Sequence, residues 1–264
     1  MENNFEKLIN LHGPVDEFKT PSGQTVYLRE INGEDENIIS NKGLSKEGKS
    51  FNLYITRVVV GFNEQIRNPT YAEVMSWGLR DKYAILIRSR IISIGSILEF
   101  RFHWPNDKQA TTYSEDLTNF IWDYNQPMPT EEDKLLYNEE RIPPYGPEFK
   151  SGYRTHTLTN GKQVRYKFST GYTEKFMMDL VDEDTHRNSE LFARELSLLV
   201  DKDWIKVENL SQFSSKDLRE IRADIEKVDK NYNLLTEVVN PRNPFEKQFI
   251  PVVGIEDFFF PKEI

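Results

Sequence analysis

Side chains that could do acid–base or metal chemistry are spread thinly along this sequence. The four histidines stand at His12, His103, His156 and His186, and no two have the spacing of a metal-ligand pair. Each is best explained as a histidine that is solvated or bonded to a close neighbour. The Gly-x-Ser-x-Gly and His-Glu-x-x-His motifs of serine hydrolases and zinc proteases are absent.

Carboxylates form two short clusters. Glu34-Asp35-Glu36 stands where a helix is expected to begin, and negative charge there suits the helix dipole. Asp182-Glu183-Asp184 is expected in a loop, where it could attract a cation, but it lacks the ligand rhythm and glycine of a calcium loop. We therefore expect no catalytic centre, no cofactor and no metal. An enzyme that uses an acidic loop is the less favoured alternative.

Two arginines occupy the most apolar helical stretch of the chain. Arg90 shares a stripe with Ile87, Ile91 and Ile94, and Arg88 lies beside it. The stem of Arg90 could pack while its head reaches water at the edge. The alternative is a buried ion pair with a carboxylate from elsewhere or from a partner subunit.

The aromatic end of the chain is a candidate binding surface. Phe258, Phe259 and Phe260 are consecutive and precede Pro261, so they cannot all point to one side of a strand. Exposed aromatic clusters mark interaction surfaces. The alternative is that this end folds back over the protein's own core.

Composition limits the classes of partner. The chain has 264 residues, no cysteine and a formal charge of −9, so disulfides and thiolate sites are excluded and nucleic acid is not expected as a partner. No apolar run reaches the length of a membrane span, and the N-terminus lacks the pattern of a signal peptide. We expect no membrane partner and a cytosolic location.

One stretch of the sequence occurs twice, and the two copies indicate which elements would position these side chains. Residues 20–36 read TPSGQTVYLREINGEDE and residues 158–174 read LTNGKQVRYKFSTGYTE. The matched positions, all with one separation (161 − 23 = 138), are Gly23 and Gly161, Val26 and Val164, Gly33 and Gly171, and Glu36 and Glu174. The match indicates a diverged duplication.

Each copy predicts the same order of elements. A β-hairpin turns at Gly23 or Gly161, a short helix follows, and longer helices are expected near 46–61 and 188–201. A second long helix begins at Thr70 or Ser214, where the separation falls to 136, as in Asp81 and Asp217. Strands over 98–104 and 234–240, proline corners, and return strands over 109–113 and 247–253 complete the copies.

These elements predict an α+β protein of two diverged repeat units. The first unit spans 1–120 and the second spans 154–264, with the aromatic tail at its end. Between them lies a proline-rich linker, 121–153, where the prolines at 127, 129, 143, 144 and 147 preclude a continuous helix.

The chain resembles the T4-type phage baseplate proteins, including the baseplate hub assembly factors. The resemblance lies in Pro21-Ser22-Gly23-Gln24-Thr25-Val26 running into Gly33-Glu34-Asp35-Glu36, in Trp77-Gly78-Leu79-Arg80-Asp81, and in Asp257-Phe258-Phe259-Phe260-Pro261. Many members carry Cys-Pro-x-Cys-Gly zinc knuckles at the strand corners. The corners here, Trp104-Pro105-Asn106-Asp107 and Asn240-Pro241-Arg242-Asn243, have no cysteine, so we expect a zinc-ribbon-like element without metal in which Trp104 packs instead. The alternative is that these corners are ordinary proline turns that never bound metal.

The resemblance implies a non-enzymatic component of a phage tail baseplate or hub, or a chaperone that promotes hub assembly. It would act by docking to other tail and baseplate proteins within a hetero-oligomeric assembly. It would be found in the host cytoplasm during assembly or in the virion tail baseplate. The candidate partner-binding residues are Phe258, Phe259, Phe260, Trp104 and Trp122. A non-phage adaptor or scaffold is the alternative.

Overall fold

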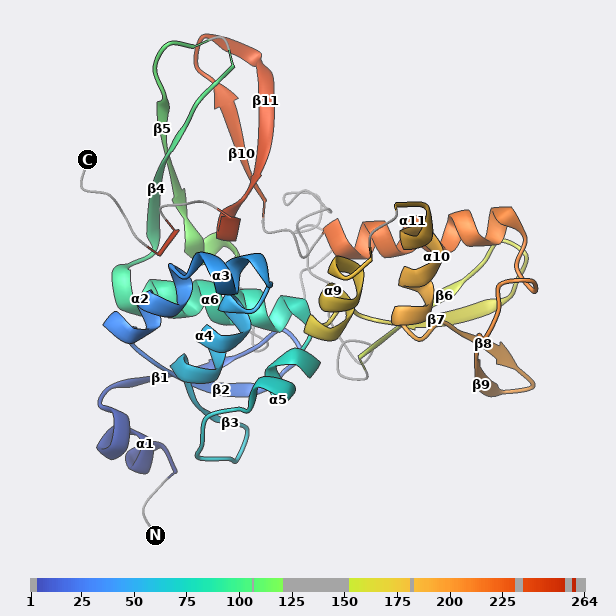
Figure 1. Ribbon diagram of the computed structural model, residues 1–264, viewed down its shortest axis with the longest axis horizontal. Coiled ribbons are helices and arrows are strands. Elements are labelled where there is room, and N and C mark those ends of the chain that lie inside the picture. Colours follow the sequence, from blue (N-terminus) through green and yellow to red (C-terminus); the bar gives the residue numbers. More distant parts are fainter. Residues whose placement is uncertain are drawn as a thin grey trace, which may run out of the picture.

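A computed structural model describes residues 4–105, 107–120, 152–180, 183–230, 235–254 and 258–259. It is a mixed α+β fold with several small antiparallel sheets (Figure 1). In chain order the elements are α1 (Asn4–His12), β1 (Val15–Lys19), β2 (Thr25–Arg29), α2 (Gly33–Ile39), α3 (Lys42–Lys46), α4 (Ser50–Val58), β3 (Val59–Phe62), α5 (Tyr71–Ser76), α6 (Leu79–Ile94), β4 (Ile97–Phe102), β5 (Thr111–Asp116), η1 (Leu117–Phe120), β6 (Tyr153–Thr157), β7 (Gln163–Lys167), α9 (Gly171–Met178), α10 (Glu183–Ala193), β8 (Ser197–Val200), β9 (Asp203–Lys206), α11 (Ser215–Lys230), β10 (Leu235–Asn240), β11 (Asn243–Pro251) and η3 (Val252–Gly254).

The N-terminal half is built on a three-stranded sheet in the order β1-β2-β3. Val26 and Leu28 alternate along β2 and are fully buried, as the sequence pattern predicts. The helix expected near 46–61 is wrong in its extent, because α4 ends at Val58 and the buried run that follows pairs with β2 as strand β3. A short run of buried β-branched residues suits either a helix or a strand, and the pairing decides which forms.

The C-terminal half contains a four-stranded sheet in the order β6-β7-β8-β9, with α9, α10 and α11 beside it (Figure 1). The helix expected near 188–201 is also too long, since α10 ends at Ala193. Glu195 has a left-handed backbone at φ 50° and the chain continues as β8. Positive φ is incompatible with helix continuation for an L-residue. The next helix, α11, begins with Ser214 and Asp217 bonded to each other as the sequence predicts.

Two β-hairpins, β4–β5 and β10–β11, lie side by side above the N-terminal half (Figure 1). The expected return strands are displaced: β5 begins at Thr111 and runs to Asp116, and β11 spans Asn243–Pro251. The hydroxyl of Thr236 on β10 bonds Glu115 on β5, and Arg242 pairs with Asp107 at 2.7 Å. The second hairpin therefore contacts the first, although the two are far apart in the sequence.

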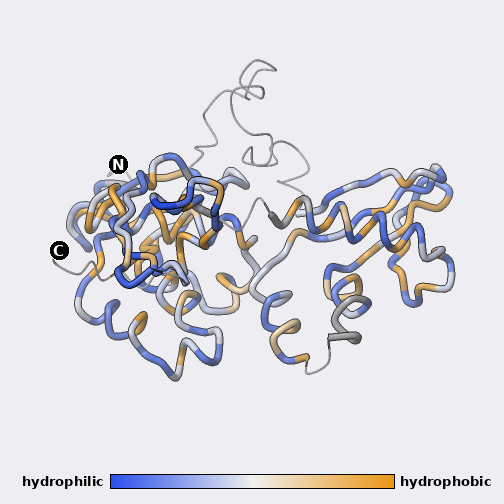
Figure 2. The backbone as a smooth tube through the Cα atoms, turned by 90° about the horizontal axis from the view of Figure 1, so that it is seen from above, coloured by the Kyte–Doolittle hydropathy of each residue, from blue (hydrophilic) through white to orange (hydrophobic). Residues whose placement is uncertain are grey.

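Two main hydrophobic clusters hold the fold together, and Figure 2 shows the two lobes side by side. The first cluster combines β1–β3, α4, α6 and the β4–β5 hairpin with residues from the end of the chain, namely Val238, Val252, Phe258 and Phe259. The second cluster uses residues from Leu158 to Ile225. The unit limits drawn from the sequence thus do not coincide with the clusters, because the chain returns to the first lobe after α11. The linker 121–153 lies outside the described residues, except for Gly152 and Tyr153 at its end.

Candidate functional site

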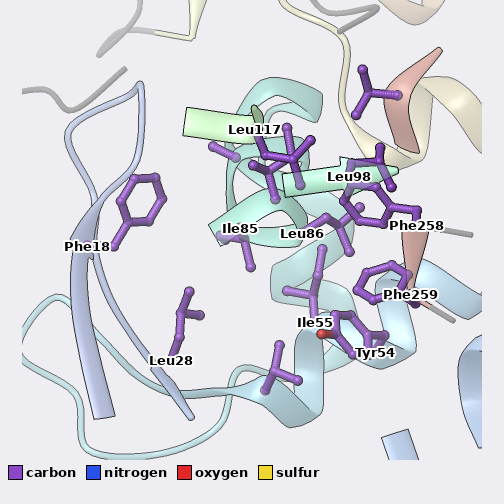
Figure 3. Close-up of a cluster of buried hydrophobic side chains, with 14 of the residues drawn as sticks. Phe18, Leu28, Tyr54, Ile55, Ile85, Leu86, Leu98, Leu117, Phe258 and Phe259 are labelled. Atoms are coloured by element: carbon purple, nitrogen blue, oxygen red, sulfur yellow. The ribbon is translucent and has the colours of Figure 1, made fainter. Parts of the chain in front are cut away.

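The aromatic end of the chain is buried where the structure describes it. Phe258 is 1% exposed and Phe259 is 5% exposed. Their rings meet edge to face at 4.7 Å, and the Phe259 ring lies 5.1 Å from that of Tyr54 (Figure 3). The alternative that this end folds back over the core therefore holds for these two side chains, and neither offers a surface to a partner. Phe260 lies outside the described residues.

Arg90 fixes this end of the chain to α6. Its Nε donates to the Phe258 carbonyl at 3.1 Å and its Nη2 donates to the Ile97 carbonyl at 2.9 Å. Burial lowers the pKa of Arg90. Arg90 is 2% exposed, so its head does not reach water, and it meets no carboxylate among the described residues. Arg88, by contrast, forms a two-bond ion pair with Asp16 at 2.6 and 2.7 Å.

Trp104 is also a core residue and not a docking residue. Its indole Nε1 donates to the Tyr113 hydroxyl at 2.8 Å, and that hydroxyl donates to the Val239 carbonyl at 2.8 Å. The Phe102 ring packs edge to face on Trp104 at 4.9 Å. This chain of hydrogen bonds joins the β4–β5 hairpin to the β10–β11 hairpin. Trp122, the remaining candidate, lies outside the described residues.

The polar clusters serve local structure where they are described. Asp35 is fully buried and accepts bonds from Arg29 and Arg57. Burial would raise the pKa of Asp35, but bonds from Arg29, the Asn32 backbone and Arg57 outweigh burial and lower it. His156 has the Glu220 and Asp224 carboxylates at 3.5 and 3.6 Å, so it has close neighbours as expected.

One exposed aromatic surface lies on the β10–β11 hairpin, which carries the most exposed ring among the described residues. Phe245 is 96% exposed and Phe249 is 56% exposed. Phe249 shares its face of β11 with Lys247, and Phe245 lies nearer the turn of the same hairpin. Lys247 pairs with Glu237 across the hairpin at 2.6 Å, which neutralises its charge beside Phe249. Alternation could have separated Phe249 from its neighbour Ile250, which is half-buried on the opposite face of β11.

A cavity of about 220 Å³ lies where the two halves of the chain meet. The halves are joined there by the Leu79 N–H, which donates to the Ser169 carbonyl at 2.9 Å, and by a β-bridge between Gly78 and Thr170. Gly171 faces the cavity, and a Cβ on it would come within 3.1 Å of the Met75 backbone. The close approach of α9 to α5 therefore depends on glycine at this position.

Lys82 is a buried charged residue in the lining of this cavity, which also includes Glu47, Glu174 and Lys175. Its side chain is 6% exposed, and Nζ donates to Asn52 Oδ1 at 3.0 Å and to Glu174 Oε2 at 3.1 Å. Burial lowers the pKa of Lys82, and Glu174 opposes that shift. No local sequence pattern marks Lys82, because its burial arises from contact between segments far apart in the chain.

A phosphate-loop spacing lies beside the same cavity. Residues 43–50 read Gly-Leu-Ser-Lys-Glu-Gly-Lys-Ser, which fits the pattern Gly-x-x-x-x-Gly-Lys-Ser. A phosphate loop follows a strand and surrounds phosphates with backbone N–H groups. Here the first glycine belongs to helix α3, and Lys49 pairs with Glu47 at 2.7 Å. The structural context does not fit a phosphate loop, so the spacing alone does not make a nucleotide site.

In the part of the chain that the structure describes, no group of three or more histidine, aspartate or glutamate side chains could hold a metal ion. No helix there has both the length and the apolarity needed to cross a membrane. Comparisons with protein-family models, with curated proteins and with solved structures find no match for this chain.

Proposed function

We propose that this chain is a non-enzymatic assembly protein that acts by docking to other proteins, as a baseplate or hub component of a contractile phage tail or as a chaperone of hub assembly. The observation that carries the docking role is the exposed aromatic surface of the β10–β11 hairpin. Phe245 and Phe249 leave two large rings in water there. The phage context rests on the sequence resemblance.

The hairpin face favours contact through its rings over addition of a strand. Pro244 and Pro251 stand near the two ends of β11. Proline lacks the N–H that a pairing strand would need, so the free edge is short and poorly suited to β-augmentation. Aromatic rings are enriched in the cores of protein interfaces. Phe245 and Phe249 are therefore the proposed anchors, in place of Phe258 and Phe259.

We also propose that the chain is a duplication of one unit. Support comes from element bounds that keep the sequence separation, in β1 and β6 (153 − 15 = 138) and in β2 and β7 (163 − 25 = 138). The long helices α6 and α11 are separated by 136 at both ends (215 − 79 = 136). The hairpin turns match as well, because Gly23 has φ 85° and Gly161 has φ 84°.

A further contact supports the duplication. The Ser22 N–H donates to the Asp81 carboxylate at 2.9 Å, and the Asn160 amide donates to the Asp217 carboxylate at 2.8 Å. Each bond joins a hairpin turn to the first turn of a long helix, at matched positions of the two copies. A bond to the matched aspartate at both sites, from a backbone N–H in one copy and a side-chain amide in the other, is an expected remnant of a common ancestor.

We propose that the strand corners are zinc-ribbon-like elements in which packing replaces metal. The support is the bonded chain from Trp104 through Tyr113 to Val239, which ties one hairpin to the other. In a zinc ribbon, metal–thiolate bonds would supply this link. Here a buried indole and two hydrogen bonds do so.

The partners we propose are other tail and baseplate proteins with basic patches. The charge of −9 favours such partners through electrostatic complementarity, which acts chiefly on the rate of association. A non-phage adaptor would use the same hairpin face. Sedimentation with baseplates separates these two proposals.

The test is sedimentation of the purified chain with assembling tails or baseplates of a T4-type phage. We expect Phe245→Ser with Phe249→Ser to abolish co-sedimentation, while Ile205→Ser, at an exposed site on β9, leaves it intact. All variants should keep the wild-type circular dichroism spectrum. Equal sedimentation of the double variant and the wild type would rule out the hairpin face. Failure of the wild type to sediment would count against the phage proposal.

A further inference from the structure

The junction cavity has the form of a small-molecule or peptide-end site. Its walls are mostly apolar and come from both halves of the chain, including Phe51, Tyr71, Met75 and Met178. At about 220 Å³ it is smaller than the roughly 300–1,000 Å³ pockets that take drug-sized ligands. It therefore suits one ring-sized apolar group. The thioethers of Met75 and Met178 can adapt their shape to such a group.

The polar end of the cavity presents a buried ammonium. An ammonium has three N–H donors, and among the described residues Lys82 has two acceptors, Asn52 and Glu174. Lys82 also lines the cavity. An acceptor inside the cavity would thus be near the remaining donor. A cationic ligand would meet Lys82 itself, so the charge selects a neutral or anionic group.

Glu174 is a partner that can be displaced. The Glu174 side chain is 36% exposed, whereas that of Lys82 is 6% exposed. The carboxylate of Glu174 can therefore rotate into water, but the ammonium of Lys82 cannot. Lys175, on the same helix, also lines the cavity and is mostly exposed. A ligand carboxylate that replaces Glu174 at Lys82 would keep the buried charge paired, as burial requires.

The first turn of α4 adds to the positive potential. Gly48, Ser50 and Asn52 line the cavity. The N-cap residue, Lys49, makes no side-chain bond to the helix N–H groups. Unpaired N–H groups and the helix dipole favour negative charge at this end of a helix. Glu47 and Glu174 nearby limit that charge, which favours a single negative charge over a dianionic phosphate.

We propose that this cavity binds a ligand made of one apolar, ring-sized group and a single carboxylate, with the carboxylate on Lys82 and the apolar group between α4, α5 and α9. Two sources share this chemistry, a free aromatic acid and the C-terminal residue of a partner chain. The site is separate from the hairpin face, so variants of Phe245 and Phe249 leave it unchanged.

The test is isothermal titration calorimetry of the full chain with 3-phenylpropionate and with its neutral amide. We expect the acid to bind roughly tenfold or more tightly than the amide, as a charge-assisted bond implies. Lys82→Met should remove this preference. Glu174→Gln keeps an acceptor but removes the competing charge, so it should tighten binding of the acid. Equal binding of acid and amide, or no binding of either, would overturn the proposal.

A second arm identifies the source of the carboxylate. Short peptides ending in phenylalanine are compared as free acids and as C-terminal amides. Tighter binding of the peptide acid than of 3-phenylpropionate indicates a chain terminus, and the reverse indicates a free acid. If Lys82→Met fails to fold, the effect of Glu174→Gln and the comparison of acid with amide in the wild type decide whether a carboxylate binds at Lys82. Preferential binding of inorganic phosphate or ATP would refute the carboxylate and favour a phosphate site at 43–50.

Discussion

Replacing Phe258 by alanine tests whether the aromatic end of the chain is core or docking surface. In the structure this ring is 1% exposed and packs edge to face on Phe259 at 4.7 Å. A docking residue could be truncated with little effect on folding. A core residue could not, because the cavity left behind loses both hydrophobic transfer energy and van der Waals contacts.

The expected cost follows from this burial. Truncating a buried phenylalanine to alanine costs about 3–5 kcal/mol, and losing an edge-to-face aromatic pair adds about 0.5–1.5 kcal/mol. The substitution also leaves in place the carbonyl that binds Arg90, so the hydrogen bond at 3.1 Å is retained. We therefore expect Phe258→Ala to lower the free energy of unfolding by roughly 5 kcal/mol.

The matched control is Phe245→Ala, the same change at a ring that is 96% exposed. We expect it to alter the free energy of unfolding by less than about 0.5 kcal/mol. Urea unfolding followed by circular dichroism measures both variants. A loss of less than about 1 kcal/mol for Phe258→Ala would show that the end of the chain does not belong to the core.

Two further predictions concern the hairpin link and an exposed ion pair. Tyr113→Phe leaves the Trp104 N–H and the Val239 carbonyl without their shared partner. We therefore expect the free energy of unfolding, measured in urea, to fall by roughly 2 kcal/mol or more. A fall of less than about 0.5 kcal/mol would contradict the link between the hairpins. Hydrogen bonds from Arg67, and then from the backbone and hydroxyl of Thr70, lower the pKa of Glu73 to about 2. The stabilisation from Glu73 is therefore present above its ordinary pKa of 4.5 and is lost as the pH falls through about 2. An NMR titration should give this value, and Arg67→Ala should raise it; a titration near 4.5 in the wild type would refute the ion pair.

Local sequence signals predicted the elements that depend on near neighbours. The turns at Gly23 and Gly161 need positive φ, which glycine adopts without a steric cost. Alternation placed Val26 and Val164 on buried strand faces, and both are fully buried. The capping box at Thr70 is present at the start of α5. In each case the signal and the structure it forms lie within a few residues.

Most of the candidate site could not be predicted from such local signals. Once strand β11 is known, alternation separates its two faces. Alternation does not show that the β10–β11 hairpin packs beside the β4–β5 hairpin, because the two hairpins are far apart in the sequence. The burial of Lys82 depends on α9 packing against α5, which requires the close approach at Gly171. No local pattern marks a lysine that becomes buried by a distant helix.

The sequence by itself determined the α+β class, the hairpin turns, the long helices and the absence of cysteine, because backbone propensity and hydrophobic periodicity act over short distances. Only the tertiary structure decided which aromatic side chains are buried and which are exposed. Phe258 and Trp104 are buried because the chain returns to the first lobe, whereas Phe245 lies on a face that nothing in the described chain covers. Burial is a property of the whole packed assembly of elements, so residues of one type can have opposite roles depending on which distant segment lies against them.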